Sequence, residues 1–277
     1  MEKLQDFISE LYHDHTSEEC FMPCKTDSNR FINEMIQLLF PLDVPRTTKD
    51  YHLRFRECEL QFRKLLSSLS SLLQEVPEKI IDDFFNALPG IYKKLRKDAE
   101  SIYKFDPAAA SVQEVIHAYP GFFAIMVYRL SHQLVKQNVP VLPRVISEYA
   151  HGRTGIDINP CALIGDSFFI DHGTGVVIGE TTSIGNNVKI YQGVTLGALT
   201  VEKALASTKR HPTIGDNVII YAGSTVLGGK TEIGHDSVIG GNVWLTESVP
   251  PNSVVYHKSE IRIRSGKTFA DPINFVI

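Results

Sequence analysis

The chain has 277 residues, of which 43% are hydrophobic and 22% charged, with a formal net charge of −4. This composition is typical of a globular protein with a sizeable core, and it favours neither nucleic acid nor an anionic membrane as a partner. The apolar runs are far shorter than the roughly 20 residues of a membrane span, and we expect no signal peptide. Four cysteines are too few for a disulfide framework, so we expect a cytoplasmic protein with free thiols.

The first half of the chain predicts an all-α domain over residues 1–150. Apolar residues recur there at helical spacing, as at Leu65, Leu69, Leu72 and Leu73. Prolines mark the expected breaks between helices, and Pro89 is one of them. The later predicted helices cover 78–88, 91–104, 111–118, 122–137 and 141–150.

A six-residue period replaces the helical one after residue 150. An aliphatic residue, often followed by glycine, stands at Ile158, Ile164, Ile170, Ile178, Ile184, Ile190, Leu196, Ile214, Ile220, Val226, Ile233, Ile239 and Leu245. Each hexad predicts a short strand and a turn, with the aliphatic side chain inside and a small residue at the corner. A β-sandwich would need alternation at period two, which is not visible. We therefore predict an α+β protein, with a β-helix over 151–258 and an extended C-terminal tail over 259–277.

The repeat is suspended at two places, and interruptions of a rigid solenoid are common positions for a functional site. Eight residues separate Ile170 from Ile178, and a loop over 198–211 follows Leu196. His172 lies in the first interruption. Imidazoles ordinarily have a pKa near 6.5, which suits a general base for a hydroxyl group. Asp157 precedes His172 by about one coil, so it is a candidate to accept the Nδ1–H of that ring.

Several motifs resemble those of the serine acetyltransferases, which are left-handed β-helix acyltransferases of the hexapeptide-repeat superfamily. The resemblance runs from about residue 104 to 257. Its motifs are Asp106-Pro107-Ala108, Tyr128-Arg129-Leu130 with His132, Gly155-Ile156-Asp157-Ile158 with Pro160, Ile170-Asp171-His172-Gly173-Thr174-Gly175, Ile178-Gly179-Glu180-Thr181, Val194-Thr195-Leu196-Gly197 and Arg210-His211-Pro212. The loop after Gly197 is longer than is usual in the family.

The resemblance implies transfer of an acetyl group from acetyl-CoA to L-serine, the first step of cysteine biosynthesis, in a ternary complex without a permanently bound cofactor or metal. It implies a catalytic dyad of His172 and Asp157. It assigns the serine ammonium to Asp106 and Asp171, and the carboxylate to Arg210 and His211; an arginine can bind both oxygens of a carboxylate. Acetyl-CoA would lie between adjacent solenoids, and we predict contacts with Gly197, Ala222 and Lys230.

The resemblance also implies partners. Solenoids of this type form homotrimers, and the helical domain could pair two trimers into a hexamer. The C-terminal Ile277 would insert into O-acetylserine sulfhydrylase, with its carboxylate and apolar side chain held in a pocket. Feedback inhibition by cysteine is a further hypothesis, because cysteine shares the zwitterionic frame of serine.

Other interpretations remain open at this stage. Taken without the family, Asp106-Pro107 is an ordinary helix start with Asp as the cap, and Arg210-His211-Pro212 is a solvated turn. Cys161 is placed for packing and not for an acetyl-enzyme. Alternative functions on the same solenoid are a sugar or other small-hydroxyl acetyltransferase, a γ-type carbonic anhydrase with three zinc-binding histidines, and a non-catalytic scaffold.

Overall fold

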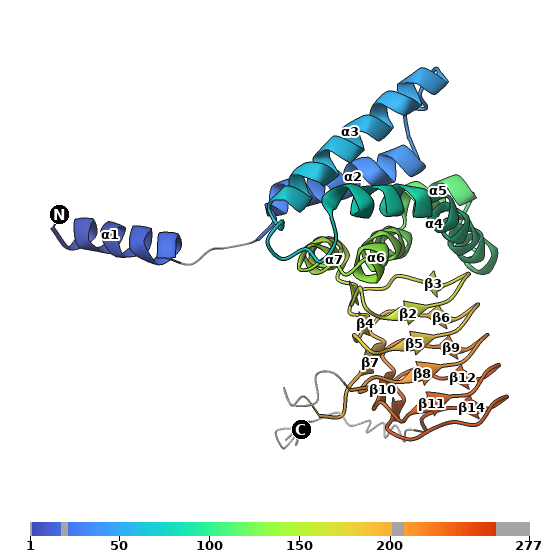
Figure 1. Ribbon diagram of the computed structural model, residues 1–277. Coiled ribbons are helices and arrows are strands. Elements are labelled where there is room, and N and C mark those ends of the chain that lie inside the picture. Colours follow the sequence, from blue (N-terminus) through green and yellow to red (C-terminus); the bar gives the residue numbers. More distant parts are fainter. Residues whose placement is uncertain (1, 18–21, 201–207, 259–277) are drawn as a thin grey trace, which may run out of the picture.

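The computed structural model describes residues 2–17, 22–200 and 208–258. Helices make up the first part of the chain and short strands the second (Figure 1). No helix in the described ranges is long and apolar enough to cross a membrane. The helices are α1 Glu2–Ser17, α2 Lys25–Leu39, α3 Thr48–Ser67, α4 Pro77–Phe105, α5 Val112–Ala118, α6 Pro120–Lys136 and α7 Leu142–Thr154.

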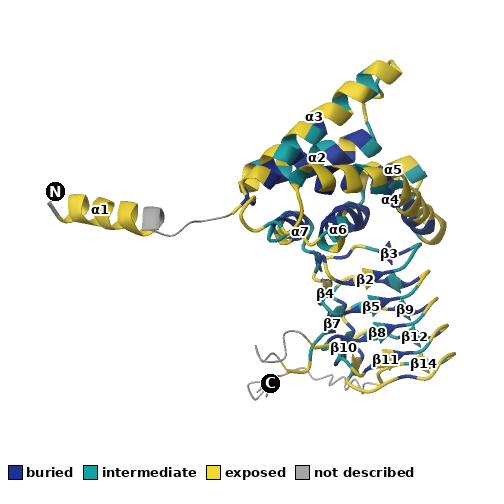
Figure 2. Cartoon of the chain, in the orientation of Figure 1, coloured by how far each residue is buried: buried dark blue, intermediate teal, exposed yellow. Residues whose placement is uncertain are grey.

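Aromatic and aliphatic side chains hold the helical part together. The rings of Phe31 on α2 and Phe62 on α3 stack with centroids 5.1 Å apart, and Phe84 on α4 lies 5.0 Å from Phe62. Figure 2 shows these helices buried on their facing sides and exposed on their outer sides. The apolar residues of α1 are different, because Leu4 and Phe7 are exposed. The described side chains of α1, residues 3–14, therefore lie outside this core.

Helix α4 corrects one sequence-based expectation. It runs without a break through Pro89, where we expected one helix to end and another to begin. Its buried residues Phe84, Leu88, Ile91 and Leu95 keep helical spacing across the proline. Burial of this continuous stripe offsets a proline cost of about 3 kcal/mol. The helical region also extends past residue 150, since α7 ends at Thr154 before Gly155 in the left-handed conformation.

The second part of the chain is a left-handed parallel β-helix with three faces. Sheet A has the order β1-β4-β7-β10-β13, sheet B the order β2-β5-β8-β11, and sheet C the order β3-β6-β9-β12-β14. The strands are β1 Asp157–Ile158, β2 Leu163–Ile164, β3 Phe169–Ile170, β4 Val177–Ile178, β5 Ser183–Ile184, β6 Lys189–Ile190, β7 Thr195–Gly197, β8 Thr213–Ile214, β9 Ile219–Ile220, β10 Thr225–Leu227, β11 Glu232–Ile233, β12 Val238–Ile239, β13 Trp244–Leu245 and β14 Val254–Val255.

The aliphatic residues of the hexads fill the interior of this prism, as predicted. In sheet A the register stacks Ile158, Ile178, Leu196 and Val226 in one buried column. Gly165 shows why glycine follows the aliphatic residue. A Cβ added there would lie 2.5 Å from the carbonyl oxygen of Gly185 on the next coil, so a larger residue would push the coils apart.

A buried ion pair joins the helices to the first coil. Arg129 on α6 binds both oxygens of Asp98 on α4, at 2.5 and 2.8 Å, and also donates to the carbonyl of Gly165. The backbone N–H of Phe168 donates to the same Asp98 carboxylate at 2.9 Å. The C-terminal half of α4 is therefore fixed against the start of the β-helix.

Candidate active site

The first interruption of the repeat forms a tight corner between sheet C and sheet A. Asp171 follows β3, and its Oδ1 accepts from the backbone N–H of His172 at 2.8 Å. His172 has a φ of 54°, which a residue other than glycine adopts at some cost. Its side chain is 72% exposed, and its Nδ1 lies 3.6 Å from Asp171 Oδ1. The corner therefore presents an imidazole to the outside beside a half-buried carboxylate.

Asp157 lies on the coil before His172, and the two segments are hydrogen-bonded neighbours. The N–H of Gly175 donates to Gly155 at 2.8 Å, and that of Asp157 to Val176 at 2.9 Å. The side chains, however, make no hydrogen bond or ion pair with each other in the described structure. The Asp157 carboxylate lies 3.8 Å from Arg144 on α7 instead. The predicted dyad of His172 and Asp157 stays a prediction.

Three groups that could bind a metal gather at this end of α7. The ligand atoms of Glu148, His151 and Asp157 all lie within 4.8 Å of one another. The guanidinium of Arg144 forms ion pairs with both Glu148 and Asp157. Arg144 thus supplies a positive charge to this cluster.

Asp106 lies at the C-terminal end of a helix, whereas its sequence context suggested the N-terminal end of one. It ends α4 and does not begin a helix, since α5 starts after Ser111, which caps it. Its Oδ1 accepts from the N–H of Ala108 at 2.8 Å, and its Oδ2 from the hydroxyl of Tyr119 at 2.7 Å. The ordinary N-cap interpretation of Asp106-Pro107 is therefore wrong.

The negative charges of Asp106 and Asp171 act on the same two tyrosines, although the aspartates come from different parts of the chain. The hydrogen bond that Tyr119 donates to Asp106 raises the pKa of Tyr119 to about 12, with burial and the charges of Asp106, Glu114 and Asp171 adding to the effect. Both aspartates also contribute, after burial and Tyr221, to a raised pKa of Tyr191. The joint binding of one ammonium group by these two carboxylates stays a prediction.

Arg210 and His211 lie at the other end of β4, where the long loop rejoins the solenoid. Their backbone N–H groups donate to Thr181 Oγ1 at 2.9 and 3.0 Å. The Arg210 guanidinium pairs with Glu180. These contacts show that the pair is anchored and is not a freely solvated turn.

The His211 ring accepts a hydrogen bond at Nδ1. Its side chain is buried over Gly179, where an added Cβ would meet Cδ2 of the ring at 2.0 Å. The backbone N–H of Thr181 donates to Nδ1 at 3.1 Å, so the neutral ring carries its proton on Nε2. Burial, followed by the charge of Arg210, holds the pKa of His211 below its ordinary value.

Comparison with known proteins identifies the family. A family model described as "Serine acetyltransferase, N-terminal" matches residues 61–127. The plasmid-encoded serine acetyltransferase of Synechococcus elongatus is 48% identical over 200 residues, covering 70% of this chain and 61% of that protein. Serine acetyltransferase isoform 3 of Entamoeba histolytica, solved in complex with cysteine, superposes with a TM-score of 0.77 at 34% identity, covering 86% of this chain and 84% of that one.

The chain belongs to the serine acetyltransferase family. A further member, from Brucella abortus and solved in complex with coenzyme A, has a TM-score of 0.62 at 28% identity. The comparison covers 84% of this chain and 80% of the Brucella chain. The likeness includes both the helical part and the β-helix, because coverage of this extent cannot come from either one alone.

The residues predicted to contact the acetyl donor are spread along the solenoid. Gly197 ends β7, Ala222 follows β9, and Lys230 is exposed between β10 and β11. Lys209 is turned toward the backbone, with its Nζ 2.7 Å from the carbonyl of Thr181. Residues 201–207 of the loop and the tail with Ile277 lie outside the described residues. The donor contacts thus stay predictions.

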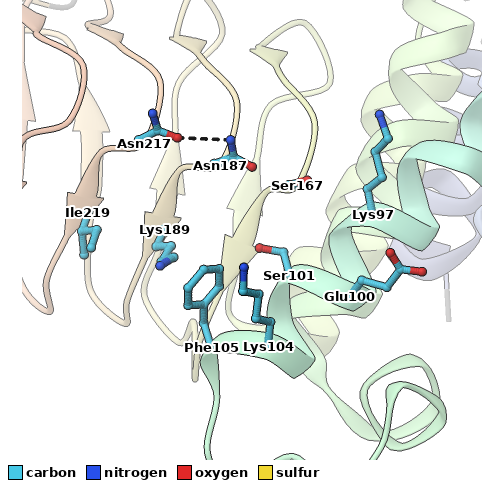
Figure 3. Close-up of a pocket in the computed structure, with 10 residues that line it drawn as sticks. All are labelled: Lys97, Glu100, Ser101, Lys104, Phe105, Ser167, Asn187, Lys189, Asn217 and Ile219. Carbon is cyan, nitrogen blue, oxygen red and sulfur yellow. Dashed lines mark hydrogen bonds between the residues drawn. The ribbon is translucent and has the colours of Figure 1, made fainter.

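A cavity of about 440 Å³ lies between the C-terminal end of α4 and sheet C (Figure 3). Lys104 and Lys189 converge there on the ring of Phe105, and the Nζ of Lys189 is 3.1 Å from the ring centre. Lys97 is neutralised by Asp166 at 2.8 Å. None of the predicted site residues lines this cavity, so it is distinct from the candidate active site.

The sequence analysis missed three residues that shape the site. Tyr119 holds Asp106, Thr181 holds Arg210 and His211, and Glu180 pairs with Arg210. Glu180 and Thr181 belong to the motif Ile178-Gly179-Glu180-Thr181, and their position directly after β4 could have marked them as site residues. Tyr119 carried no such signal, because its contact with Asp106 depends on how three helices pack.

Proposed function

We propose that this protein transfers the acetyl group of acetyl-CoA to the hydroxyl of L-serine. The observation that carries the proposal is the link that residues 119–121 make between the two parts of the chain. The Tyr119 hydroxyl donates to Asp106 at 2.7 Å, and Gly121 packs on Ile170, directly before Asp171 and His172. Two carboxylates suit the ammonium of an amino acid, and the imidazole beside them suits its hydroxyl. Family membership and the coenzyme A complex of the Brucella relative support the same substrates.

The chemistry proposed for His172 is general-base catalysis in a ternary complex. Its Nε2 takes the proton from the serine hydroxyl as that oxygen attacks the thioester carbon. The tetrahedral intermediate then expels the sulfur of CoA, which receives the proton back as a thiol. Asp157 would accept the Nδ1–H and stabilise the imidazolium. The distance of 3.8 Å between Arg144 and Asp157 exceeds a hydrogen bond, which leaves the carboxylate free to accept.

The serine carboxylate would be held by a second copy of the chain. Arg210 and His211 lie at the far end of β4 from His172. The six residues from Gly175 to Glu180 lie between the two corners, and five steps along an extended chain span roughly 16 Å. One serine cannot reach both groups within one chain. A ring of three chains would place the Arg210 corner of one solenoid beside the His172 corner of its neighbour, as expected for a heterologous interface.

The proposal is tested by acetyl-CoA-dependent release of free thiol with a panel of acceptors. We expect turnover with L-serine and little with sugars or with 3-hydroxypropionate, which lacks the ammonium group. Faster turnover with a sugar than with serine would overturn the proposal and support the alternative of a small-hydroxyl acetyltransferase.

A further inference from the structure

Asp106 occupies an unfavourable position for a carboxylate. It caps the C-terminal end of α4, where the last carbonyl groups give the helix dipole its negative end. Asp171 places a second negative charge in the same region. The helix dipole and the charge of Asp171 both disfavour an ionised Asp106, so stabilising contacts are needed to hold it there. Its carboxylate accepts hydrogen bonds from the N–H of Ala108 and from the hydroxyl of Tyr119.

Tyr119 is well placed to hold the Asp106 carboxylate because its own position is fixed. It stands between α5 and α6, and Pro120 after it begins α6. Gly121 then packs directly on the end of β3, where an added Cβ would lie 2.3 Å from the carbonyl oxygen of Ile170. Asp171 is the next residue along that strand. Residues 119–121 therefore touch both the helix end that carries Asp106 and the strand end that carries Asp171.

The phenol of Tyr119 is also chemically suited to the task. Its hydroxyl donates to Asp106 Oδ2 at 2.7 Å, and its pKa of about 12 keeps it protonated throughout the neutral range. A neutral donor can hold one carboxylate oxygen without cancelling the negative charge. A lysine in the same place would compete with the substrate's ammonium for that charge.

We infer that Tyr119 is a positioning residue for substrate binding, which holds the Asp106 carboxylate toward Asp171 so that the two together receive the α-ammonium of the acceptor. This inference rests on the proposed function. It assigns to Tyr119 a role in the affinity for the acceptor, and none in proton transfer or in binding of acetyl-CoA.

Steady-state kinetics of Tyr119→Phe test the inference, because this change removes only the hydroxyl. We expect the KM for serine to rise about tenfold, as for loss of a hydrogen bond to a charged group. The kcat and the KM for acetyl-CoA should stay within about twofold of the wild-type values. The preference for serine over 3-hydroxypropionate should fall by the same factor as the affinity for serine, because only serine carries the ammonium.

Tyr149→Phe is the matched control. Its hydroxyl also bonds a side chain of the helical part, Asn33, but none of the site residues. An unchanged KM for serine in Tyr119→Phe would overturn the inference, as would equal losses with both acceptors. If Asp106→Asn raises the KM for serine while Tyr119→Phe does not, only the inference fails. If the wild-type protein does not acetylate serine, the proposed function fails first.

Discussion

Two histidines of the candidate site differ in exposure and in chemistry. His172 is exposed at a corner of the solenoid, with its Nδ1 3.6 Å from Asp171. His211 is buried, and burial lowers its pKa, so it is neutral near pH 7 with its Nδ1 occupied by Thr181. This difference in environment is consistent with the two separate roles proposed for them, His172 as the base and His211 in binding the acceptor's carboxylate.

Gly179 determines where the His211 ring can lie. Gly179→Ala places a Cβ 2.0 Å from the ring carbon Cδ2, and the ring must move away from its contact with Thr181. Since His211 is proposed to bind the acceptor's carboxylate, we expect kcat/KM for serine to fall about 10- to 100-fold, as for loss of a charge-assisted hydrogen bond. Steady-state kinetics with serine as the varied substrate measure this effect.

Gly90→Ala is the control for this change. Gly90 lies within α4, and an added Cβ would meet nothing within 4 Å. This substitution should leave the kinetics unchanged and raise the free energy of unfolding by about 0.5–1 kcal/mol. Unchanged kinetics in Gly179→Ala would mean that the position of the His211 ring does not matter for the acceptor.

At the scale of elements, the site depends on how α4 is attached to the first coil. The helix ends in Asp106, and its last turns are held by the pair of Asp98 with Arg129. Both side chains are buried, and the charge on each is compensated by the other and by backbone groups of Gly165 and Phe168. A buried charge that loses its partner is costly, so this contact is sensitive to substitution.

Removal of one partner tests this attachment. We expect Asp98→Ala to lower the free energy of unfolding by about 3–5 kcal/mol, because Arg129 would be left buried without a carboxylate. Glu78→Ala breaks the exposed pair with Arg63 and should cost no more than about 1 kcal/mol. Chemical denaturation of the two variants measures the difference, and equal effects would contradict a structural role for the buried pair.

The sequence predicted the elements of the β-helix better than those of the helical part. A period of six is a local property, so Ile158 and the later aliphatic residues could be assigned inward without knowledge of the coils. The break expected at Pro89 was wrong because packing of α4 overrides a local preference. Tyr119 and Gly121 could not be predicted, since their partners Asp106 and Ile170 are distant in the sequence or belong to another element.

The proposed acceptor site of the whole molecule needs residues from more than one chain. The corner with Asp171 and His172 and the corner with Arg210 and His211 lie at opposite ends of β4. Each chain would therefore contribute its His172 corner to one site and its Arg210 corner to another. This arrangement links activity to assembly, which a site contained within one chain would not do.

Mixed trimers distinguish a shared site from an internal one. His172→Ala and Arg210→Ala chains, each with a different affinity tag, can be co-expressed and purified through both tags in turn. Each mixed trimer should restore one of its three sites, so we expect about a third of the wild-type activity from two inactive parents. Activity no higher than that of either parent would show that His172 and Arg210 must belong to the same chain.

The central claim is that His172 accepts the proton of the serine hydroxyl. The most direct measurement is thiol release from acetyl-CoA with saturating serine, using His172→Asn, which cannot serve as the base, and His235→Asn on an exposed, distant coil as its control. We expect His172→Asn to lower kcat by about 10²- to 10⁴-fold and His235→Asn to keep the wild-type rate. A kcat for His172→Asn within about threefold of the wild-type value would contradict it.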